Sequence, residues 1–400
     1  MIKIKAYKYR IYPTVAQREL LAKHFGCVRW VYNYALAKKV AAYATNKTTI
    51  SSYDLIKEIV ILKKNEETAW LSEVNSQSLQ MALFNLDQAF TKFFRERAGF
   101  PNFKKKGGRD SAQFPQSTNV DFDNNKLFVM KFREGIKCRF HRTFEGRIKT
   151  TTISRTPTGK YYASILVEEQ APDIIQHPLD VAKALGIDVG IKSLITTSAG
   201  DKIENPKHLR QSIKKLKKAQ RRLSKKVKGS NKRNKQRHKV AVIHEKIANQ
   251  RKDFLHKITR QLVDESQVTT YCLETLNIAG MLKNHKLAKA IGDVGWHTFV
   301  EFLSYKAAWA GKNILRIGMF EPSSKACNAC GLINSKLTLK EREWICDCGA
   351  VHDRDINAAR NIRDFAFAKQ NLLGQGLPED TPGEIAFLVA VSEPGSPHPL

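Results

Sequence analysis

Residues 184–190 read ALGIDVG, and residues 193–197 read SLITT. The first run is apolar except for Asp188, which predicts a buried strand, and the second run predicts its hairpin partner. An aspartate in the middle of a buried strand is costly unless it is paired with a cation or bound to a metal. Asp188 is therefore a candidate metal ligand, and a buried salt bridge is the alternative.

Two further carboxylates have comparable settings. Glu274 ends an apolar strand-like run, and Asp355 opens a helical pattern, so an ion pair and a helix cap are the respective alternatives. Two-metal phosphodiester hydrolysis gathers carboxylates around two cations about 4 Å apart, and Mg²⁺ prefers hard oxygen ligands. Together with Asp188, the set favours a magnesium site, with manganese as an alternative ion. Asp353 is a rival candidate, whereas Asp201 fits a turn.

Four of the seven cysteines form a cluster, in which a C-x-x-C is followed, after fifteen intervening residues, by a C-x-C. This spacing is typical of a tetrahedral structural zinc site, which has no open position for catalysis. The second pair is one residue shorter than a usual knuckle, so His352 is the alternative fourth ligand. The other three cysteines have apolar neighbours, which indicates core positions in a reducing compartment. The candidate zinc ligands are Cys327, Cys330, Cys346 and Cys348.

The charge of the chain points to a polyanionic partner. Its 400 residues carry a formal charge of +30, with a pI near 9.8. No apolar run of about 18 residues and no signal-like N-terminus occurs, so nucleic acid is favoured over a membrane. Residues 201–260 hold 22 Lys or Arg against 4 Asp or Glu. An exposed helical face without a ligand is the alternative interpretation.

The basic stretch is helical from about residue 206 to 262, and Gly229 interrupts it, which predicts two antiparallel helices. Lysine predominates there, which suits phosphate contacts that carry little sequence information. A second basic segment, beside Gly107 and Gly108, resembles a flexible phosphate-contacting loop. The candidate nucleic-acid contacts are Lys104, Lys105, Lys106, Lys214, Lys218, Arg221, Arg222 and Arg251.

The first half of the chain has a different pattern. Residues 2–12 alternate in polarity and predict a strand, and Thr14 is positioned to cap a following helix. Helical spacing continues to about residue 98, and strand patterns occupy residues 113–169. The N-terminal strand is expected to join those later strands in one sheet, with the helical block as an insertion. The proline-containing stretch 171–182 predicts a linker.

These motifs in combination resemble the transposon-encoded TnpB (OrfB) proteins, which are related to type V CRISPR effectors. The similarity extends over nearly the whole chain. The residues that carry it are YRIYP (9–13), GCVRWVYN (26–33), residues 78–94, GFPNFK (99–104), GIDVG (186–190), QRKDFLHK (250–257), Glu274 and the block from the first cysteine to Asn357.

The resemblance implies a RuvC-like nuclease of RNase H fold, with Asp188, Glu274 and Asp355 as its metal-binding catalytic acids. It also implies a guide RNA made from the transposon end and a double-stranded DNA target. A short adjacent motif would be read by the N-terminal helices, with Gln80 as a candidate. One active site would cut both strands in turn. No small-molecule cofactor and no membrane are implied, and the location is cytoplasmic, near the nucleoid.

The expected fold class is α/β and multi-domain: an RNase H-like nuclease domain with an inserted zinc ribbon, plus an N-terminal β-barrel-like sheet with a helical insertion. The expected ranges are 1–14 and 99–178 for the β-rich, wedge-like domain, 15–98 for the helical recognition domain, 179–320 and 351–372 for the nuclease domain, 321–350 for the zinc ribbon and 373–400 for a disordered tail.

Two other functions fit the same residues. A strand-transferring transposase can also gather three acids on an RNase H fold. A DNA-binding repressor derived from the same scaffold would keep the basic surface but would not need three costly buried carboxylates. The complete acidic set therefore favours the nuclease over the repressor.

Overall fold

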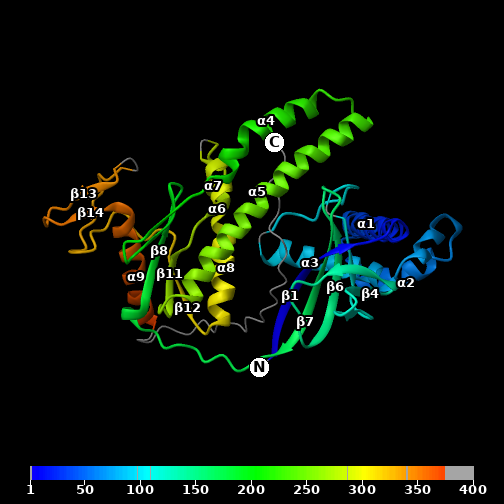
Figure 1. The fold of residues 1–400 in the computed structure, drawn as a ribbon, viewed down its shortest axis with the longest axis horizontal. Helices are drawn as coiled ribbons and strands as arrows, with labels where there is room; N and C mark the ends of the chain where they lie inside the picture. Colours follow the sequence, from blue (N-terminus) through cyan, green and yellow to red (C-terminus); the bar gives the residue numbers. More distant parts are fainter. Residues whose placement is uncertain (1, 97, 109, 286, 339–340, 374–400) are drawn as a thin grey trace. The chain divides into compact units, whose positions relative to one another are not determined.

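The computed structural model describes residues 2–96, 98–108, 110–285, 287–338 and 341–373. The chain divides into two compact units, the first ending at Pro172 and the second beginning at Asp173. Each unit is built on its own sheet (Figure 1). No helix within the described ranges is long and apolar enough to cross a membrane.

One antiparallel sheet forms the centre of the first unit. Its strands are β1 (Ile2–Tyr12), β2 (Asp110–Phe114), β3 (Asn119–Asp121), β4 (Lys126–Val129), β5 (Phe132–Arg139), β6 (Arg147–Arg155) and β7 (Tyr161–Gln170). They are ordered β2-β6-β7-β1-β5-β4-β3, so the N-terminal strand lies between strands from much later in the chain. Among these strands β2 and β3 are the ends of an open sheet, whereas the sequence predicts a barrel-like one.

The alternation along β1 fits this central position. Tyr7, Tyr9 and Ile11 are buried, and Lys8 between them is exposed, as the period of two predicts. The strand pairs with β7 over nearly its whole length, from Ile2 opposite Gln170 to Ile11 opposite Tyr161. The prediction of a strand at residues 2–12 is therefore confirmed.

The helices of the first unit follow β1 directly. They are α1 (Val15–Asn46), α2 (Ser52–Leu62), the 3-10 helix η1 (Glu66–Glu73) and α3 (Ser76–Arg95). The predicted cap at Thr14 is confirmed, because its hydroxyl accepts from the backbone N–H of Gln17 at 3.3 Å. The Gln17 side chain accepts in turn from the Thr14 N–H at 3.0 Å, which completes a capping box.

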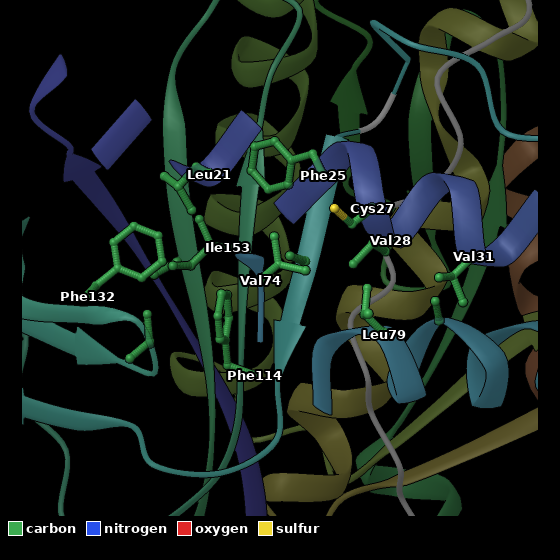
Figure 2. Close-up of a cluster of buried hydrophobic side chains, with 14 of the residues drawn as sticks. Leu21, Phe25, Cys27, Val28, Val31, Val74, Leu79, Phe114, Phe132 and Ile153 are labelled. Carbon is green, nitrogen blue, oxygen red and sulfur yellow. The ribbon is translucent and has the colours of Figure 1, made fainter. Parts of the chain in front are cut away.

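The core of the first unit lies between α1, α3 and the sheet (Figure 2). Phe25 and Val31 of α1 and Leu79 of α3 belong to one buried cluster with Phe114 of β2 and Ile153 of β6. This burial explains the helical spacing of Leu21, Phe25, Val28 and Val31 in α1 and of Leu79, Leu83 and Leu86 in α3, all of which belong to this core.

The second unit contains a mixed sheet and a small hairpin. Its strands are β8 (Ala184–Val189), β9 (Ser193–Thr197), β10 (Lys202–Glu204), β11 (Thr270–Glu274) and β12 (Asn313–Ile317), and the hairpin is β13 (Glu343–Ile345) with β14 (Val351–Asp353). The order is β10-β9-β8-β11-β12. The first three strands are antiparallel neighbours, and β11 runs parallel to both β8 and β12.

Helices cover both faces of this sheet. They are α4 (His208–Ser224), α5 (Asn231–Asp264), α6 (Ile278–Met281), α7 (Ala288–Val294), α8 (Trp296–Trp309) and α9 (Arg354–Leu373), with a 3-10 turn η2 (Val181–Lys183) before β8. Apolar residues of α5 and α8 pack on one face, among them Leu255 and Phe299. On the other face Ile362 and Ala366 of α9 pack against Cys272 of β11.

The basic stretch forms the predicted helical hairpin, since α4 and α5 run back along each other (Figure 1). The tip is fixed by Arg233, whose guanidinium donates to the carbonyls of Leu223 and Lys226 at 2.9 and 2.8 Å. The strand patterns expected at residues 113–169 contain β3 to β7, whereas β10, β13 and β14, which have three residues each, were not predicted. The expected tail lies outside the described residues from position 374 onward.

Candidate active site and cysteine cluster

Two of the three candidate acids lie at the carboxyl ends of neighbouring parallel strands. The register of β8 and β11 pairs Ile187 with Leu273, so Asp188 and Glu274 are the next residues along the two strands. Side chains one position beyond a paired couple share the opposite face of the sheet. Asp188 and Glu274 are therefore adjacent, on the face that α9 covers.

Gly186 brings the third acid to them. A Cβ atom at this position would lie only 1.9 Å from the carbonyl oxygen of Ala359, so only glycine allows the α9 backbone to approach β8 this closely. Gly186 precedes Asp188 by two residues, and Ala359 follows Asp355 by about one helical turn. The contact thus places the start of α9 beside the end of β8.

The electrostatics of Asp188 register the charges of both other carboxylates. Burial first, and then the negative charges of Asp355 and Glu274, raise the pKa of Asp188 to about 7. The positive charges of Arg354 and Arg342 oppose this rise. Burial also raises the pKa of Glu274. Clustered acids that are costly to ionise form a site at which a cation is strongly favoured.

The opening of α9 is capped by Asp353 and not by Asp355. Asp353 Oδ1 accepts from the backbone N–H groups of Asp355 and Ile356 at 3.1 Å each, and Asp353 Oδ2 accepts from Lys202 at 2.6 Å. The Asp355 carboxylate instead accepts from Arg342 at 3.2 and 3.4 Å. The sequence allowed Asp355 to be the helix cap, but in the structure Asp353 caps α9.

The other rival, Asp201, has the turn role expected of it. Its backbone N–H donates to the Thr197 hydroxyl at 3.1 Å, and the Thr197 backbone N–H donates to the Asp201 carbonyl at 2.9 Å. Both residues belong to the β9–β10 connection. Asp201 is therefore accounted for without a metal.

The burial of Asp188 has a consequence for stability. In Mg²⁺-free buffer, Asp188→Asn is expected to stabilise the folded chain above pH 7 and to change little below pH 4. The folded-state pKa of about 7 exceeds the ordinary 3.8, so the unfolded chain loses its proton first as the pH rises. At about 1.4 kcal/mol per pH unit the gain is at most roughly 4 kcal/mol, reduced by solvent access to part of the residue. Thermal unfolding at pH 4 and pH 8 measures the difference, and an equal effect at both would contradict it.

The four clustered cysteines form a compact group of sulfur atoms. Among the described residues they are the one set of three or more His, Cys, Asp or Glu whose ligand atoms all lie within 4.8 Å of one another. The Sγ atoms of Cys327 and Cys348 are 3.8 Å apart, and those of Cys330 and Cys346 are 3.6 Å apart. Tetrahedral Zn–S bonds of about 2.3 Å require sulfur separations of about 3.8 Å. The cluster fits a structural zinc ion.

His352, the alternative ligand, lies outside this sulfur group. Its Nε2 is 3.0 Å from Cys327 Sγ, and its ring packs on Trp344 with centroids 4.7 Å apart. The short C-x-C is accommodated because Gly349 adopts a left-handed φ of +85° directly after Cys348.

Zinc content tests this arrangement. We expect about one equivalent of zinc per purified chain, and we expect Cys330→Ser to lose it, because three thiolates bind zinc far more weakly than four. Elemental analysis of both proteins is the measurement. Native chain that contains no zinc while keeping its fold and activity would overturn the assignment.

The candidate nucleic-acid contacts differ in their exposure and in their contacts within the protein. Lys214, Lys218, Arg221 and Arg222 are exposed on α4, and Lys105 and Lys106 are exposed after α3. Gln80 is half-buried on α3. Lys104 is exposed as well, but it is held in place: its backbone exchanges hydrogen bonds of 2.9 and 2.7 Å with the Asn33 side chain, and its ammonium lies 3.8 Å from the centre of the Tyr32 ring. Desolvation of this ammonium lowers the pKa of Lys104 to about 8.

Arg251 is engaged inside the protein. Its guanidinium lies 3.3 Å from the carboxylate of Asp293, which also accepts from the backbone N–H groups of Leu209 and Arg210 at the start of α4. Asp293 is thus a remote cap for α4, whose own preceding residue provides no side-chain cap. This pairing favours a structural role for Arg251 over a phosphate contact.

Sequence reasoning missed Arg342. It precedes β13 in the cysteine-containing segment, and its guanidinium is the one cation that the described residues place in hydrogen-bond contact with Asp355. No local pattern marks it, because the pair joins two segments that meet only in the folded structure.

Three family models match the chain. The OrfB model of IS605 elements, described as "Probable transposase", matches residues 164–285. The TNB domain of Cas12f1-like proteins matches residues 296–362, which include the cysteine cluster and the start of α9. An OrfB model described as a helix-turn-helix domain matches residues 1–48, although here those residues form β1 and one continuous helix, α1.

Proteins similar to the whole chain are also known. A "Putative RNA-guided DNA endonuclease" from Streptomyces pristinaespiralis is 45% identical over 361 residues, which cover 90% of this chain and 88% of that protein. A second protein described as a putative RNA-guided DNA endonuclease, from Escherichia coli, is 32% identical over 378 residues, which cover 90% of this chain and 92% of that protein. The solved structure of a Cas12f1–sgRNA–target DNA complex is also similar, with a TM-score of 0.54 and 13% sequence identity. The alignment covers 90% of this chain and 99% of the chain in that structure. That likeness shows a shared, Cas12-like α/β fold with mixed sheets.

Proposed function

The chain belongs to the TnpB (OrfB) family of transposon-associated RNA-guided DNA endonucleases, and on that premise we propose that Asp188, Glu274 and Asp355 are its catalytic centre. The observation that carries the proposal is the convergence of three segments: Asp188 and Glu274 end adjacent parallel strands, and the close contact between Gly186 and Ala359 brings the start of α9, with Asp355, to the end of β8. Burial of Asp188, and then the charges of Asp355 and Glu274, raise the pKa of Asp188. The strand order of the second unit, an antiparallel triplet followed by two parallel strands, supports a RuvC-like domain of RNase H fold.

The donor set fits magnesium. Carboxylate oxygens are hard ligands, and the carboxyl ends of β8 and β11 together with the start of α9 supply them from three directions. Bound Mg²⁺ would supply a nucleophilic water and neutralise the developing charge on the phosphate. Asp188 and Glu274 would orient that water and the scissile phosphate, while Arg342 lies close enough to Asp355 to hold its carboxylate in place. The cysteine cluster has no open position and stays outside the reaction.

We further propose that base pairing with a guide RNA selects the DNA target. In such a division of labour the protein holds the heteroduplex by its backbone and shape. The exposed cations of α4, with Lys105 and Lys106, suit phosphate contacts. Gln80, on the half-buried face of α3, would read base edges of a short adjacent motif. We also propose the domain ranges inferred from the sequence for the β-rich, helical, nuclease and zinc-ribbon segments.

Cleavage of a matched plasmid tests the function directly. The purified protein, with the RNA that copurifies with it and Mg²⁺, should cut a target complementary to that RNA and leave an unmatched plasmid intact. Joining of DNA ends by the protein alone would identify a strand-transfer enzyme. Guided binding without any cutting by the native chain would identify a repressor.

Salt dependence tests the contribution of α4. Replacing Lys214, Lys218, Arg221 and Arg222 together with alanine is expected to flatten the slope of log affinity against log salt by about 3, since each neutralised phosphate contributes about 0.7–0.9. Binding titrations between low and moderate salt measure this. The control is Lys257→Ala on α5, because that ammonium is already paired with Asp253 at 2.8 Å. An unchanged slope in the fourfold variant would remove α4 from the interface.

A further inference from the structure

A row of buried amides joins α9 to the segment that carries the first cysteine pair. Asn357 and Asn361 are one turn apart and only 2% and 3% exposed. Asn357 Nδ2 donates to the Ala326 carbonyl at 2.7 Å, and Asn357 Oδ1 accepts from the Asn328 backbone N–H at 2.9 Å. Asn361 Nδ2 lies 2.7 Å from the carbonyl oxygens of Ala326 and Ser323.

The contact is reciprocated from within the C-x-x-C. Asn328 follows Cys327 directly, and its Nδ2 donates to Asn361 Oδ1 at 3.2 Å and to Asp364 Oδ2 at 2.8 Å. Asn357 and Asn361 therefore use both ends of their amides in bonds to the cysteine-containing segment. Each such bond costs about 1–3 kcal/mol to break when its partner stays buried, so the row resists displacement.

The row is the second of two attachments between this segment and α9. The first is covalent, since β14 runs directly into α9 at Asp353, and it is supported by a hydrogen bond of 2.8 Å from the Arg354 N–H to the Arg342 carbonyl. A helix held at one point can pivot about it. A helix held at residue 353 and along the face bearing Asn357 and Asn361 cannot.

We propose that Asn357 and Asn361 are positioning residues that fix Asp355 by tying the start of α9 to the cysteine cluster. The inference rests on the proposed function, in which Asp355 is a metal-binding acid. Asp355 lies between the two attachments, two residues before Asn357. The opposite side of the same helical turns packs against β8 at Gly186. Zinc that orders the cysteine cluster would thereby also set the place of a carboxylate that is not its ligand. A shift of about 1 Å in such a group costs on the order of a hundredfold in rate.

The test is the affinity of the full-length chain for Mg²⁺, measured without nucleic acid by calorimetry or by competition with luminescent Tb³⁺. Asn357→Ala combined with Asn361→Ala should keep its zinc, because all four cysteines remain, but should bind Mg²⁺ at least tenfold more weakly. Chelating the zinc should weaken Mg²⁺ binding in the native chain and have little additional effect in the double variant. Such non-additivity is the signature of a coupled pair of sites.

Asn334→Ala is the matched control. Asn334 also lies in the cysteine-containing segment, and its Oδ1 accepts from the Lys336 N–H at 3.1 Å, away from α9. It should leave the Mg²⁺ affinity unchanged. If the double variant fails to fold, the same measurements are made on Asn328→Ala. Asn328 is half-buried, and its side chain donates to Asn361 and Asp364 of α9.

Two outcomes overturn different claims. A folded, zinc-loaded double variant with native Mg²⁺ affinity would overturn the positioning role while leaving the catalytic centre intact. A native chain that binds no Mg²⁺ at any concentration used would overturn the proposed catalytic centre itself.

Discussion

Asp188→Ala is expected to abolish guided DNA cleavage, with a loss of at least about a thousandfold, or roughly 4 kcal/mol of transition-state stabilisation. Burial of Asp188, and then the charges of Asp355 and Glu274, oppose its ionisation. Removing it takes away a ligand position that no other described side chain on β8 can supply. Rates of single-turnover cleavage of a matched plasmid are the measurement.

The loss of cleavage is informative only if the Asp188→Ala variant still binds guide RNA and target DNA. The variant should retain the affinity of the native chain for guide RNA and target, since Asp188 is not part of the basic surface. Asp201→Ala is the matched control, because Asp201 lies in the turn between β9 and β10 and its hydrogen bonds are confined to that turn. Residual cutting above a tenth of the native rate would show that the centre lies elsewhere.

Gly186→Ala is expected to reduce cleavage nearly as severely, although the residue carries no functional group. A methyl group there would lie 1.9 Å from the Ala359 carbonyl oxygen, and backbone on both sides leaves no flexible neighbour to yield. The start of α9 must move away from β8, and Asp355 moves with it. Overpacking of this kind costs about 1–3 kcal/mol or more in stability. Cleavage rate and thermal unfolding should be measured together.

Gly292→Ala on α7 is the control for this substitution, because a Cβ atom there meets no atom within 4 Å. It should leave both measurements close to native. The Gly186 variant should still contain zinc and bind guide RNA. Native cleavage by a folded Gly186→Ala chain would show that the close approach of α9 does not position the acids.

The fold of the second unit could largely be predicted, because burial leaves a strong pattern in short strands. The runs at residues 184–190 and 193–197 correspond closely to β8 and β9. Of the proposed site, the identity of the acids could be predicted from costly polar residues at strand and helix ends. The distinction between Asp355 and Asp353 could not, because both lie at the same helix start and only the hydrogen bonds identify Asp353 as the cap.

Contacts between distant segments left no local signal. Glycines at 186 and 190 look alike in the sequence, yet only the packing of α9 shows that Gly186 lies under a helix. The same holds for Arg251, which the basic composition of its surroundings marks as a nucleic-acid contact. Its partner Asp293 is 42 residues away, and the pair becomes visible only when α5 and α7 meet at the start of α4.

The central place of β1 has a consequence during synthesis. The first twelve residues leave the ribosome early, but their main partner β7 ends at Gln170, so the strand must wait for about 150 more residues. At translation rates of about 5–20 residues per second, that delay is roughly 10–30 s. Until β5 and then β7 have been synthesised, Tyr7, Tyr9 and Ile11 cannot be buried in the complete sheet, so nascent chains need protection from association at their leading end.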